Sequence, residues 1–395
     1  MHQHETADVV IIGGGIIGSA VAYALTHAAT TPNRVIIIER DLAYREASTP
    51  RSAGGIRQQF STPENILLSQ ATLHLIANLK HQFGADAELS FHEKGYLILA
   101  SADGQDVLRQ NAAVQRSLGA KTCLLQPNEL TSRFPWLTSD GLALGSYGTS
   151  GEGWIDPTAL LTLLRKAAIT KGAKLVADTV TGFAKSGGAI TTVQTASGRQ
   201  ISAGIVVNAA GPWSGAVANL AGIKLPVEPR KRYVYVVDCR EAPEDLRRGP
   251  LTVDPNGVWF RPEGRTFICG VSPSEADEPP ATDLDHIDYA PYENCVWPAL
   301  ATRVRYFESL KLMNAWAGYY DYNTLDQNAI IDRHPEIRNF YMATGFSGHG
   351  LQQAYAAGRA IAELILYDSF TTIDLTRFGY ARIANKQPLF ELNVI

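Results

Sequence analysis

Cysteine is scarce in this sequence, and its four cysteines lie far apart, at Cys123, Cys239, Cys269 and Cys295. None stands in the C-x-x-C spacing that is typical of metal sites and redox pairs. The nine histidines show no metal-ligand spacing either. We therefore expect reduced, buried thiols in a reducing compartment, and no metal site.

Long apolar runs are missing as well. The run VIII at residues 35–38 is far too short to cross a bilayer, and no segment approaches the roughly twenty apolar residues that a spanning helix needs. The first residues, MHQHETADVV, lack the basic and apolar regions of a signal peptide. We expect a cytoplasmic protein without a membrane span.

Neither sign of charge predominates. The chain carries 35 Lys and Arg against 39 Asp and Glu, a net charge of -4. Because nucleic-acid binding usually requires a basic surface, this balance disfavours a nucleic-acid partner. We expect the acidic stretch 274–288, SEADEPPATDLDHID, to form an exposed loop whose carboxylates are solvated.

The N-terminal part predicts a β-α-β unit. A continuous Val/Ile strand at residues 9–12 is followed by glycines, a helix rich in small residues and a second strand, RVIIIER. Unbroken apolar strands are typical of a parallel sheet that is covered on both faces. Further on, Asp156 as N-cap, Pro157 at the first position and Gly172 at the end predict another helix. A buried strand at residues 205–207 extends the sheet.

The remaining strands are short and are separated by turn residues, which is typical of an antiparallel sheet. They are KGYLILAS, RKRYVYVVD, LTVD, GVWFRPEG and RTFICGVS. Since 395 residues exceed the size at which one core usually keeps growing, we predict two domains. The expected fold class is α/β (α+β overall), with a discontinuous Rossmann-like domain of residues 1–90, 150–222 and 322–395, and a discontinuous substrate domain on an antiparallel sheet, of residues 91–149 and 223–321.

Three glycines and one glutamate predict a dinucleotide site. Gly13, Gly15 and Gly18 form the pattern G-x-G-x-x-G between strand and helix, and Glu39 ends the next strand. The first glycine allows a tight turn, the second lets backbone approach a pyrophosphate, and the third lets the helix pack on the strand. The carboxylate of Glu39 would accept hydrogen bonds from a ribose and disfavours NADP. The fingerprint alone fits both FAD and NAD.

Two further small-residue turns follow strands. NAAGPWS, residues 208–214, is either an ordinary strand-end turn or a backbone surface that packs against a cofactor. ATGFSGHGLQQA, residues 343–354, leads into a helix that we expect to begin near Gly350. Free N–H groups at that helix start would stabilise negative charge on a ligand. Gly358, within the same helix, would permit close packing against a neighbour.

These motifs, together with STPRSAGGIRQQF and GWIDPTALLTLLRKAAITKGAKL, resemble one family over nearly the whole chain. It is the family of FAD-dependent amine oxidoreductases typified by D-amino-acid oxidase, glycine oxidase, monomeric sarcosine oxidase and dimethylglycine dehydrogenase. The resemblance implies non-covalent FAD, with adenine on the N-terminal unit and the flavin ring between the two domains. The cofactor-binding residues that it implies are Gly13, Gly15, Ile16, Ile17, Gly18, Glu39, Arg40, Ser48, Arg51, Ser52, Arg57, Val180, Ala209, Gly211, Trp213, Gly318, Gly345, Ser347, Gly348, His349, Gly350 and Leu351.

The resemblance also implies a reaction. It is oxidation of the carbon–nitrogen bond of an amino acid, secondary or N-substituted, to an imine by hydride transfer to the flavin. Such a reaction needs a neutral amine, an aimed C–H bond and the exclusion of water, so a catalytic base is optional. Tyr320, in WAGYY, is expected to touch the substrate through its hydroxyl. His349, between two glycines, either takes part in catalysis or braces its loop.

A cation is expected for the substrate's carboxylate. Arg261 is our first candidate, on a strand expected to face the flavin, and the alternatives are Arg230, Lys231 and Arg232. Because side chains alternate along a strand, Arg230 and Arg232 should point to one face and Lys231 to the other.

The chain departs from sarcosine oxidase at the positions that bind the substrate there. Phe60 stands in place of an arginine and Gln352 in place of a lysine, which makes Gln352 a candidate specificity determinant. Ile268 stands near the lysine that promotes reaction with oxygen, which favours a dehydrogenase over an oxidase. Gly318 replaces the cysteine that carries covalent flavin in some relatives.

Two other functions stay open. The chain could be a non-catalytic or electron-transferring flavoprotein subunit or assembly factor, or an FAD-dependent 2-hydroxy-acid oxidoreductase on the same fold. The expected partners are a small amino-acid-like substrate and, for the electrons, an acceptor protein or partner subunit.

Overall fold

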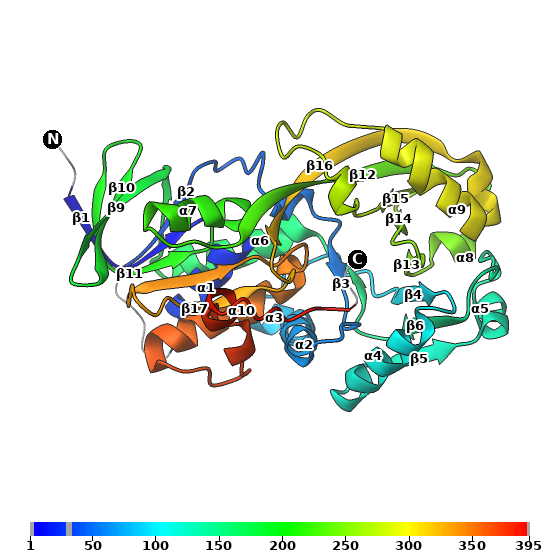
Figure 1. Cartoon of the computed structure of the whole chain (residues 1–395), viewed down its shortest axis with the longest axis horizontal. Helices are drawn as coiled ribbons and strands as arrows, with labels where there is room; N and C mark the ends of the chain where they lie inside the picture. The colour runs from blue at the N-terminus through cyan, green and yellow to red at the C-terminus, as the bar shows by residue number, and fades with distance from the viewer. Residues whose placement is uncertain (1–3, 29–33, 393–395) are drawn as a thin grey trace.

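The computed structural model describes residues 4–28 and 34–392 of the chain. It contains two eight-stranded sheets and a short two-stranded sheet. In Figure 1 the first large sheet and its helices lie in the left half of the molecule and the second sheet lies in the right half. The long strands β12 (Val227–Asp238) and β16 (Lys311–Asn323) reach from one half to the other.

The first sheet is mainly parallel, as its Val/Ile strands predict. Its strands are β1 His4–Ile12, β2 Val35–Glu39, β8 Lys174–Ala177, β9 Val180–Ser186, β10 Ala189–Thr195, β11 Gln200–Asn208, β17 Ile330–Arg333 and β18 Phe340–Thr344. Their order is β17-β18-β11-β1-β2-β8, and the antiparallel pair β9-β10 joins beside β11. β1 pairs in parallel with both β2 and β11.

Eleven labelled α-helices occur in the described residues. They are α1 Ile16–His27, α2 Pro63–Ala77, α3 Leu79–Phe83, α4 Gln105–Ser117, α5 Pro127–Arg133, α6 Pro157–Thr170, α7 Ser214–Leu220, α8 Glu244–Arg247, α9 Trp297–Arg303, α10 Gly350–Tyr367 and α11 Tyr380–Ala384. Short 3-10 turns are η1 Thr49–Arg51, η2 Gly211–Trp213, η3 Glu275–Asp277, η5 Arg305–Ser309 and η6 Thr376–Phe378, and η4 Tyr292–Val296 is a π-helical turn.

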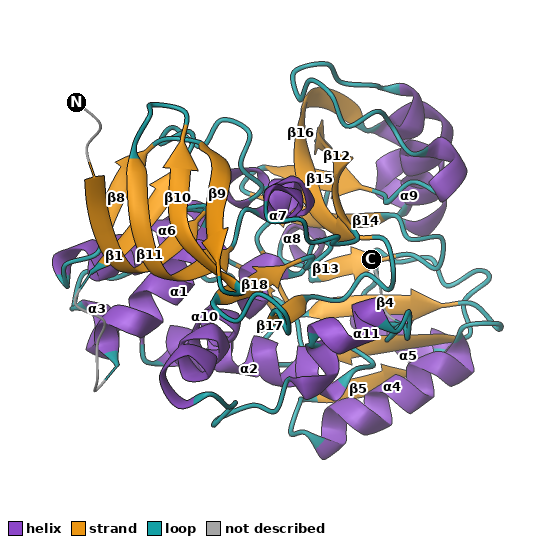
Figure 2. Cartoon of the chain, turned by 60° about the vertical axis from the view of Figure 1, so that its left-hand side comes forward, coloured by secondary structure: helices purple, strands orange, loops and turns teal. Residues whose placement is uncertain are grey.

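Both faces of the first sheet are buried. Val9 and Ile11 of β1 pack into a core formed with α1, α2, α6 and α10, whereas Val10 and Ile12 pack into a second core with β9, β10 and α7. Figure 2 shows α1, α6 and α10 beside this sheet. The predicted two-sided burial of these strands is therefore confirmed.

Helices α1 and α10 approach closely because one of them carries a glycine at the crossing. A Cβ added at Gly358 would lie 2.4 Å from the backbone carbon of Ala20 and 2.7 Å from its Cβ. The predicted packing role of Gly358 is confirmed. The predicted N-cap of α6 is also present, because Asp156 Oδ1 accepts hydrogen bonds from the backbone N–H groups of Thr158 and Ala159 at 2.8 and 3.1 Å.

The second sheet has the order β16-β12-β15-β14-β13-β4-β6-β5. Its remaining strands are β4 Tyr96–Ala100, β5 Thr122–Leu125, β6 Leu144–Gly148, β13 Leu251–Val253, β14 Trp259–Glu263 and β15 Thr266–Gly270. All its pairs are antiparallel except β13 with β4, which are parallel. The two-stranded sheet joins β3 (Gly55–Ile56) to β7 (Gly153–Trp154). The division of the chain into two domains stays a proposal.

Two expectations about the surface need correction. Cys239 and Cys269 are buried, but Cys123 is only partly buried and Cys295 is exposed, because Cys295 lies on the outer side of the π-helical turn η4. The acidic stretch 274–288 is not a wholly solvated loop. Its Glu278 forms ion pairs with two arginines of β12, and Lys231 Nζ donates to the backbone oxygens of Asp283 and His286 at 2.6 Å.

Within residues 4–28 and 34–392, none of the helices combines the length and the apolar character that crossing a membrane requires. The same described residues contain no group of three or more His, Cys, Asp or Glu side chains placed to hold a metal ion.

Candidate functional site

A cavity of about 520 Å³ extends from the glycine turn of the first sheet to the inner strands of the second. Most of the predicted cofactor residues line it: Gly13, Gly15, Ile16, Ile17, Glu39, Arg40, Ser48, Arg51, Ser52, Arg57, Val180, Ala209, Gly211, Trp213, Gly318, Gly348, His349, Gly350 and Leu351. Gly18, Gly345 and Ser347 are not in this lining. Three further residues proposed to contact the substrate, Arg232, Tyr320 and Gln352, line it as well.

The glycine turn is built as the fingerprint predicts. Gly13 has φ +99°, and a Cβ there would lie 2.3 Å from the backbone oxygen of Ala209. A Cβ at Gly18 would lie 1.9 Å from the Gly13 oxygen, so Gly18 supports the turn from behind and does not face the cavity. At Gly15 a Cβ would meet only Thr49 Oγ1, at 3.8 Å. Backbone is thus open to a ligand at Gly15.

Glu39 sits where β2 ends at the cavity. Its Oε2 accepts a hydrogen bond from the Gly14 N–H at 2.7 Å, and its Oε1 accepts one from the Asp41 N–H at 2.9 Å. A carboxylate can accept about four hydrogen bonds, so each oxygen retains capacity for a ribose hydroxyl.

The wall between the glycine turn and the second sheet carries polar groups. Ser48 Oγ is buried and has no hydrogen-bond partner among the described residues. The Arg40 guanidinium lies 3.4 Å from the centre of the Trp213 ring. Arg51 donates to the backbone oxygens of Arg45 and Ala317 at 2.7 and 2.8 Å. The partnerless Ser48 hydroxyl is therefore available to a polar group of a ligand, as a cofactor-binding role for this residue requires.

The second glycine loop is held against Tyr320. Gly348 has φ +98°, and a Cβ there would lie 2.5 Å from Tyr320 Cε2. The Asp321 carboxylate accepts the Phe346 N–H at 3.0 Å, and burial raises the pKa of this carboxyl to about 6. Helix α10 then begins at Gly350, as predicted, with its N-terminus at the cavity.

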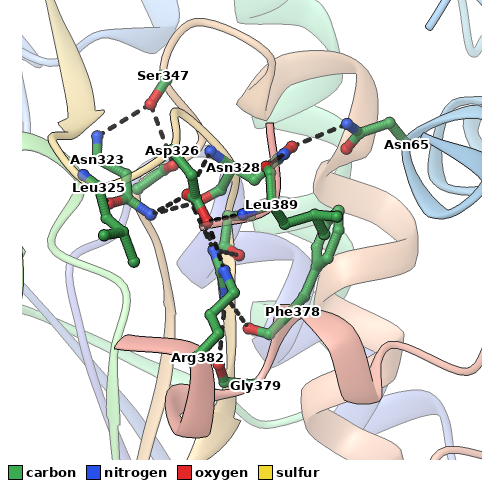
Figure 3. A network of polar contacts seen from close by, with 12 residues as sticks. Asn65, Asn323, Leu325, Asp326, Asn328, Ser347, Phe378, Gly379, Arg382 and Leu389 are labelled. Atoms are coloured by element: carbon green, nitrogen blue, oxygen red, sulfur yellow. Dashed lines mark hydrogen bonds and ion pairs between the residues drawn. The ribbon is translucent and has the colours of Figure 1, made fainter. Parts of the chain in front are cut away.

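A buried polar network supports this loop from below (Figure 3). Ser347 Oγ accepts the Asn323 N–H at 2.9 Å, and Asn323 Nδ2 donates to Asp326 Oδ1 at 2.9 Å. Asp326 forms a buried ion pair with Arg382, whose Nε lies 2.8 Å from Oδ2. Arg382 also donates to the backbone oxygen of Asn328 at 2.9 Å. Ser347 therefore positions the loop and does not line the main cavity.

Arg57, His349 and Gln352 form one buried cluster at the cavity wall. The Gln352 Oε1 accepts the Arg57 backbone N–H at 2.7 Å, and Arg57 Nη2 lies 3.1 Å from His349 Nε2. Burial, followed by the Arg57 charge, lowers the pKa of His349 to about 3. His349 is therefore neutral at physiological pH, and we assign Nε2 as the acceptor of the Arg57 N–H. Phe60 packs edge-on against His349, with ring centres 5.1 Å apart.

Of the candidate cations, Arg232 lines the cavity and Arg261 does not. Arg261 Nη2 donates to the Ala53 backbone oxygen at 2.8 Å, Nη1 donates to the Pro262 oxygen at 2.9 Å, and the guanidinium also pairs with Glu263. Through these contacts, Arg261 joins β14 to the segment after η1. Arg232 lies 5.3 Å from the centre of the Tyr320 ring.

The alternation predicted for β12 is confirmed. Arg230 and Arg232 both lie over the Tyr322 ring, at 5.1 and 5.9 Å from its centre, whereas Lys231 reaches the 283–286 segment on the opposite face.

Several lining residues were not found from the sequence. They include Tyr44, Thr49, Tyr96, Asp178, Trp259 and Ser272. Thr49 Oγ1 accepts the Ile16 N–H at 3.2 Å and so caps the start of α1, and the Tyr44 hydroxyl donates to the Gly14 oxygen at 2.9 Å. Thr49 stands next to Pro50 in STPRS, which is a turn signal in the sequence. Its hydrogen-bond partner Ile16, however, lies 33 residues earlier, so the local pattern does not indicate this contact.

The cavity suits a long dinucleotide with a planar head. It offers open backbone at Gly15, an acceptor carboxylate at Glu39, the partnerless Ser48 hydroxyl and a helix N-terminus at Gly350. The residues present therefore fit FAD.

Comparison with known proteins agrees with this fit. A family model described as FAD dependent oxidoreductase matches residues 8–364. The chain is 43% identical to FAD-dependent oxidoreductase domain-containing protein 1 of Bos taurus over 96% of this chain and 85% of that protein. It is 28% identical to glycine oxidase of Geobacillus kaustophilus over 96% of this chain and 98% of that one. The solved L-proline dehydrogenase from P. horikoshii is similar, with a TM-score of 0.85 and 28% identity over 98% of this chain and 100% of that chain.

Proposed function

Because the chain belongs to the family of FAD-dependent oxidoreductases and uses FAD, we propose that it oxidises the carbon–nitrogen bond of an amino acid to an imine. The proposed substrate has a secondary or N-substituted amine. Bound FAD supplies the acceptor for the hydrogen and the two electrons that leave the substrate's carbon. The nitrogen lone pair closes the C=N bond, and the nitrogen's proton is released.

The observation that carries this proposal is the pairing of Tyr320 with Arg232 at the cavity wall. Arg232 is 8% exposed and its Nε has no hydrogen-bond partner among the described residues. Burial raises the pKa of the Tyr320 phenol, so its hydroxyl stays protonated and can donate a hydrogen bond. A guanidinium and a phenol hydroxyl can both donate hydrogen bonds to a carboxylate. The site is therefore better suited to an amino acid, which carries a carboxylate, than to a simple amine.

The other cluster residues hold the geometry. Gln352 fixes the Arg57 backbone, and Arg57 in turn orients His349. The low pKa of His349 makes it a poor general base, so we assign it to positioning. The substrate's amine must therefore reach the site already neutral, and hydride transfer to the flavin requires that water be kept away from the reacting atoms.

Oxidised FAD would be regenerated by an acceptor other than oxygen. Ile268 is 1% exposed and does not line the cavity, so this position offers no cation to promote reaction with oxygen. Gly318 lines the cavity where a cysteine would be needed for attachment, which supports dissociable FAD. Cytoplasmic location and an acceptor protein stay predictions.

Anaerobic reduction of the flavin tests the proposal. The FAD-loaded protein is mixed with primary, N-methylated and cyclic secondary amino acids, and separately with 2-hydroxy acids, while the visible flavin band is followed. We expect at least one secondary or N-substituted amino acid to bleach the band. If only a 2-hydroxy acid bleaches it, the protein is an oxidoreductase of hydroxy acids, and if neither class does, the amino-acid proposal is wrong.

A further inference from the structure

A second, smaller chamber adjoins the main cavity. It has a volume of about 260 Å³, and Arg232, Ser272 and Tyr320 line both spaces. The chamber's other lining includes Glu278, from the segment after β15, and Tyr322 of β16. Arg232 and Tyr320 therefore form the wall between the two spaces.

Glu278 places a carboxylate between two arginines of β12. Its Oε1 lies 2.5 Å from Arg232 Nη1, and its Oε2 lies 3.5 Å from Arg230 Nη1. The side chain of Glu278 is 13% exposed and that of Arg232 is 10% exposed. Arg230 keeps a second partner, Glu228, at 2.5 Å. The two guanidinium groups thus form a carboxylate site that the chain itself fills.

Arg230 and Arg232 retain unused hydrogen-bond donors while they are paired with Glu278. The Nε groups of Arg230 and Arg232 are buried and have no hydrogen-bond partner among the described residues. A buried donor without a partner is costly, and a planar carboxylate bound side-on to a guanidinium would satisfy the Nε and one Nη together. Glu278 meets Arg232 only through Nη1, so its contact is not the best that a carboxylate could make there.

The segment that carries Glu278 is anchored elsewhere. Lys231 Nζ holds the Asp283 and His286 backbone oxygens, and the Tyr235 hydroxyl donates to the Asp288 oxygen at 2.8 Å. Glu278 can therefore leave the arginines while the later part of the segment stays attached. Exchange of Glu278 for another carboxylate would also keep the charge of the buried Arg232 guanidinium paired, which avoids a large desolvation penalty.

We propose that a substrate's carboxylate binds Arg230 and Arg232 in exchange for Glu278, so that Glu278 is a tethered competitor and the site selects substrates with a free carboxylate. This inference rests on the proposed function for the identity of the ligand as a substrate. Binding of a carboxylate at these arginines can nevertheless be measured without turnover.

The test uses N-acetylglycine, an amino-acid analogue with a free carboxylate, and its neutral counterpart N-acetylglycinamide. Each is titrated into the FAD-loaded protein, and binding is followed by the change in the visible flavin spectrum and by calorimetry. The variants are Glu278→Gln, Arg232→Gln and the control Asp277→Asn. The control removes one negative charge from the same turn, where Asp277 accepts a hydrogen bond from Ser274 that asparagine can also accept.

Removal of the competitor should tighten binding. We expect N-acetylglycine to bind Glu278→Gln about tenfold more tightly than the unaltered protein, the scale of one charge-assisted hydrogen bond, and Arg232→Gln at least about tenfold more weakly. Asp277→Asn should bind within about twofold of the unaltered protein, and N-acetylglycinamide should show no gain in Glu278→Gln.

A merely structural ion pair gives a different result. In that case Glu278→Gln and Arg232→Gln would both weaken binding, because each would loosen the same wall. Equal or weaker binding of N-acetylglycine to Glu278→Gln, with FAD content and circular dichroism unchanged, would overturn the proposal. So would an equal gain for N-acetylglycinamide. If binding follows our expectation but no amino acid reduces the flavin, the carboxylate site stands and the proposed reaction fails.

Discussion

Substitution of Gly348 by alanine tests the contact between the second glycine loop and Tyr320. Gly348 has φ +98°, a region that side chains rarely adopt, and its Cβ would lie 2.5, 2.7 and 3.0 Å from three atoms of the Tyr320 side chain. Backbone strain should cost about 1–2 kcal/mol. Overpacking against a buried ring should add about 1–3 kcal/mol.

Gly257 is the matched control. It has φ +83°, and a Cβ there would meet nothing within 4 Å. In Gly257→Ala, backbone strain alone should lower the unfolding free energy, by about 1–2 kcal/mol. In Gly348→Ala, strain and overpacking together should lower it by about 2–5 kcal/mol. In a Tyr320→Ala background the clash is gone, so Gly348→Ala should cost no more than the control.

Urea unfolding of the FAD-free protein gives these free energies, followed by tryptophan fluorescence and circular dichroism together so that coincident transitions justify a two-state fit. The reasoning is refuted if Gly348→Ala costs no more than Gly257→Ala. It is also refuted if the cost persists unchanged in the Tyr320→Ala background.

Three further predictions follow from buried groups. Asp326→Ala leaves Arg382 without its buried partner and should lower the unfolding free energy by about 3–5 kcal/mol, while the exposed pair removed by Glu244→Ala should cost below about 1 kcal/mol, both measured by urea unfolding. Burial raises the pKa of Glu152 from 4.5 to about 7, so the folded state holds its proton more tightly than the unfolded state. Its contribution is complete below pH 4.5 and is lost as the pH rises to about 7. Relative to wild type, Glu152→Gln should therefore gain about 3 kcal/mol across that window, and a constant difference would contradict this. Because the pKa of His349 is about 3, this side chain does not titrate near pH 6–7. The pH profile of flavin reduction should therefore be the same in that range, near pH 6–7, for His349→Asn and the unaltered protein, and a step there that only the unaltered protein shows would contradict this.

Local rules explain which parts of the site could be predicted from the sequence. The turn at Gly13 and the start of α10 at Gly350 depend on glycines that are adjacent to their own strands and helices, so their pattern is visible over a few residues. The opposite facing of Arg232 and Lys231 follows from strand alternation alone. These predictions needed no knowledge of which segment packs where.

Predictions that required long-range packing were less successful. Arg261 is turned toward Ala53, 208 residues earlier, and this contact cannot be seen in the local pattern of its strand. Glu278 reaches Arg232 across 46 residues, from a stretch whose charges are typical of an exposed loop. Likewise Asp326 and Arg382 are 56 residues apart, and nothing near either residue indicates a buried pair.

The most direct test of the proposed reaction is the effect of deuterium on the rate of flavin reduction. The amino acid that bleaches the flavin most rapidly is prepared with deuterium on the carbon next to nitrogen and mixed with the FAD-loaded protein without oxygen in a stopped-flow instrument. If this carbon gives up its hydrogen in the step that reduces the flavin, the deuterated substrate should reduce it severalfold more slowly. Equal rates for both substrates, measured where binding is saturated, would contradict the proposal that this step breaks the carbon–hydrogen bond.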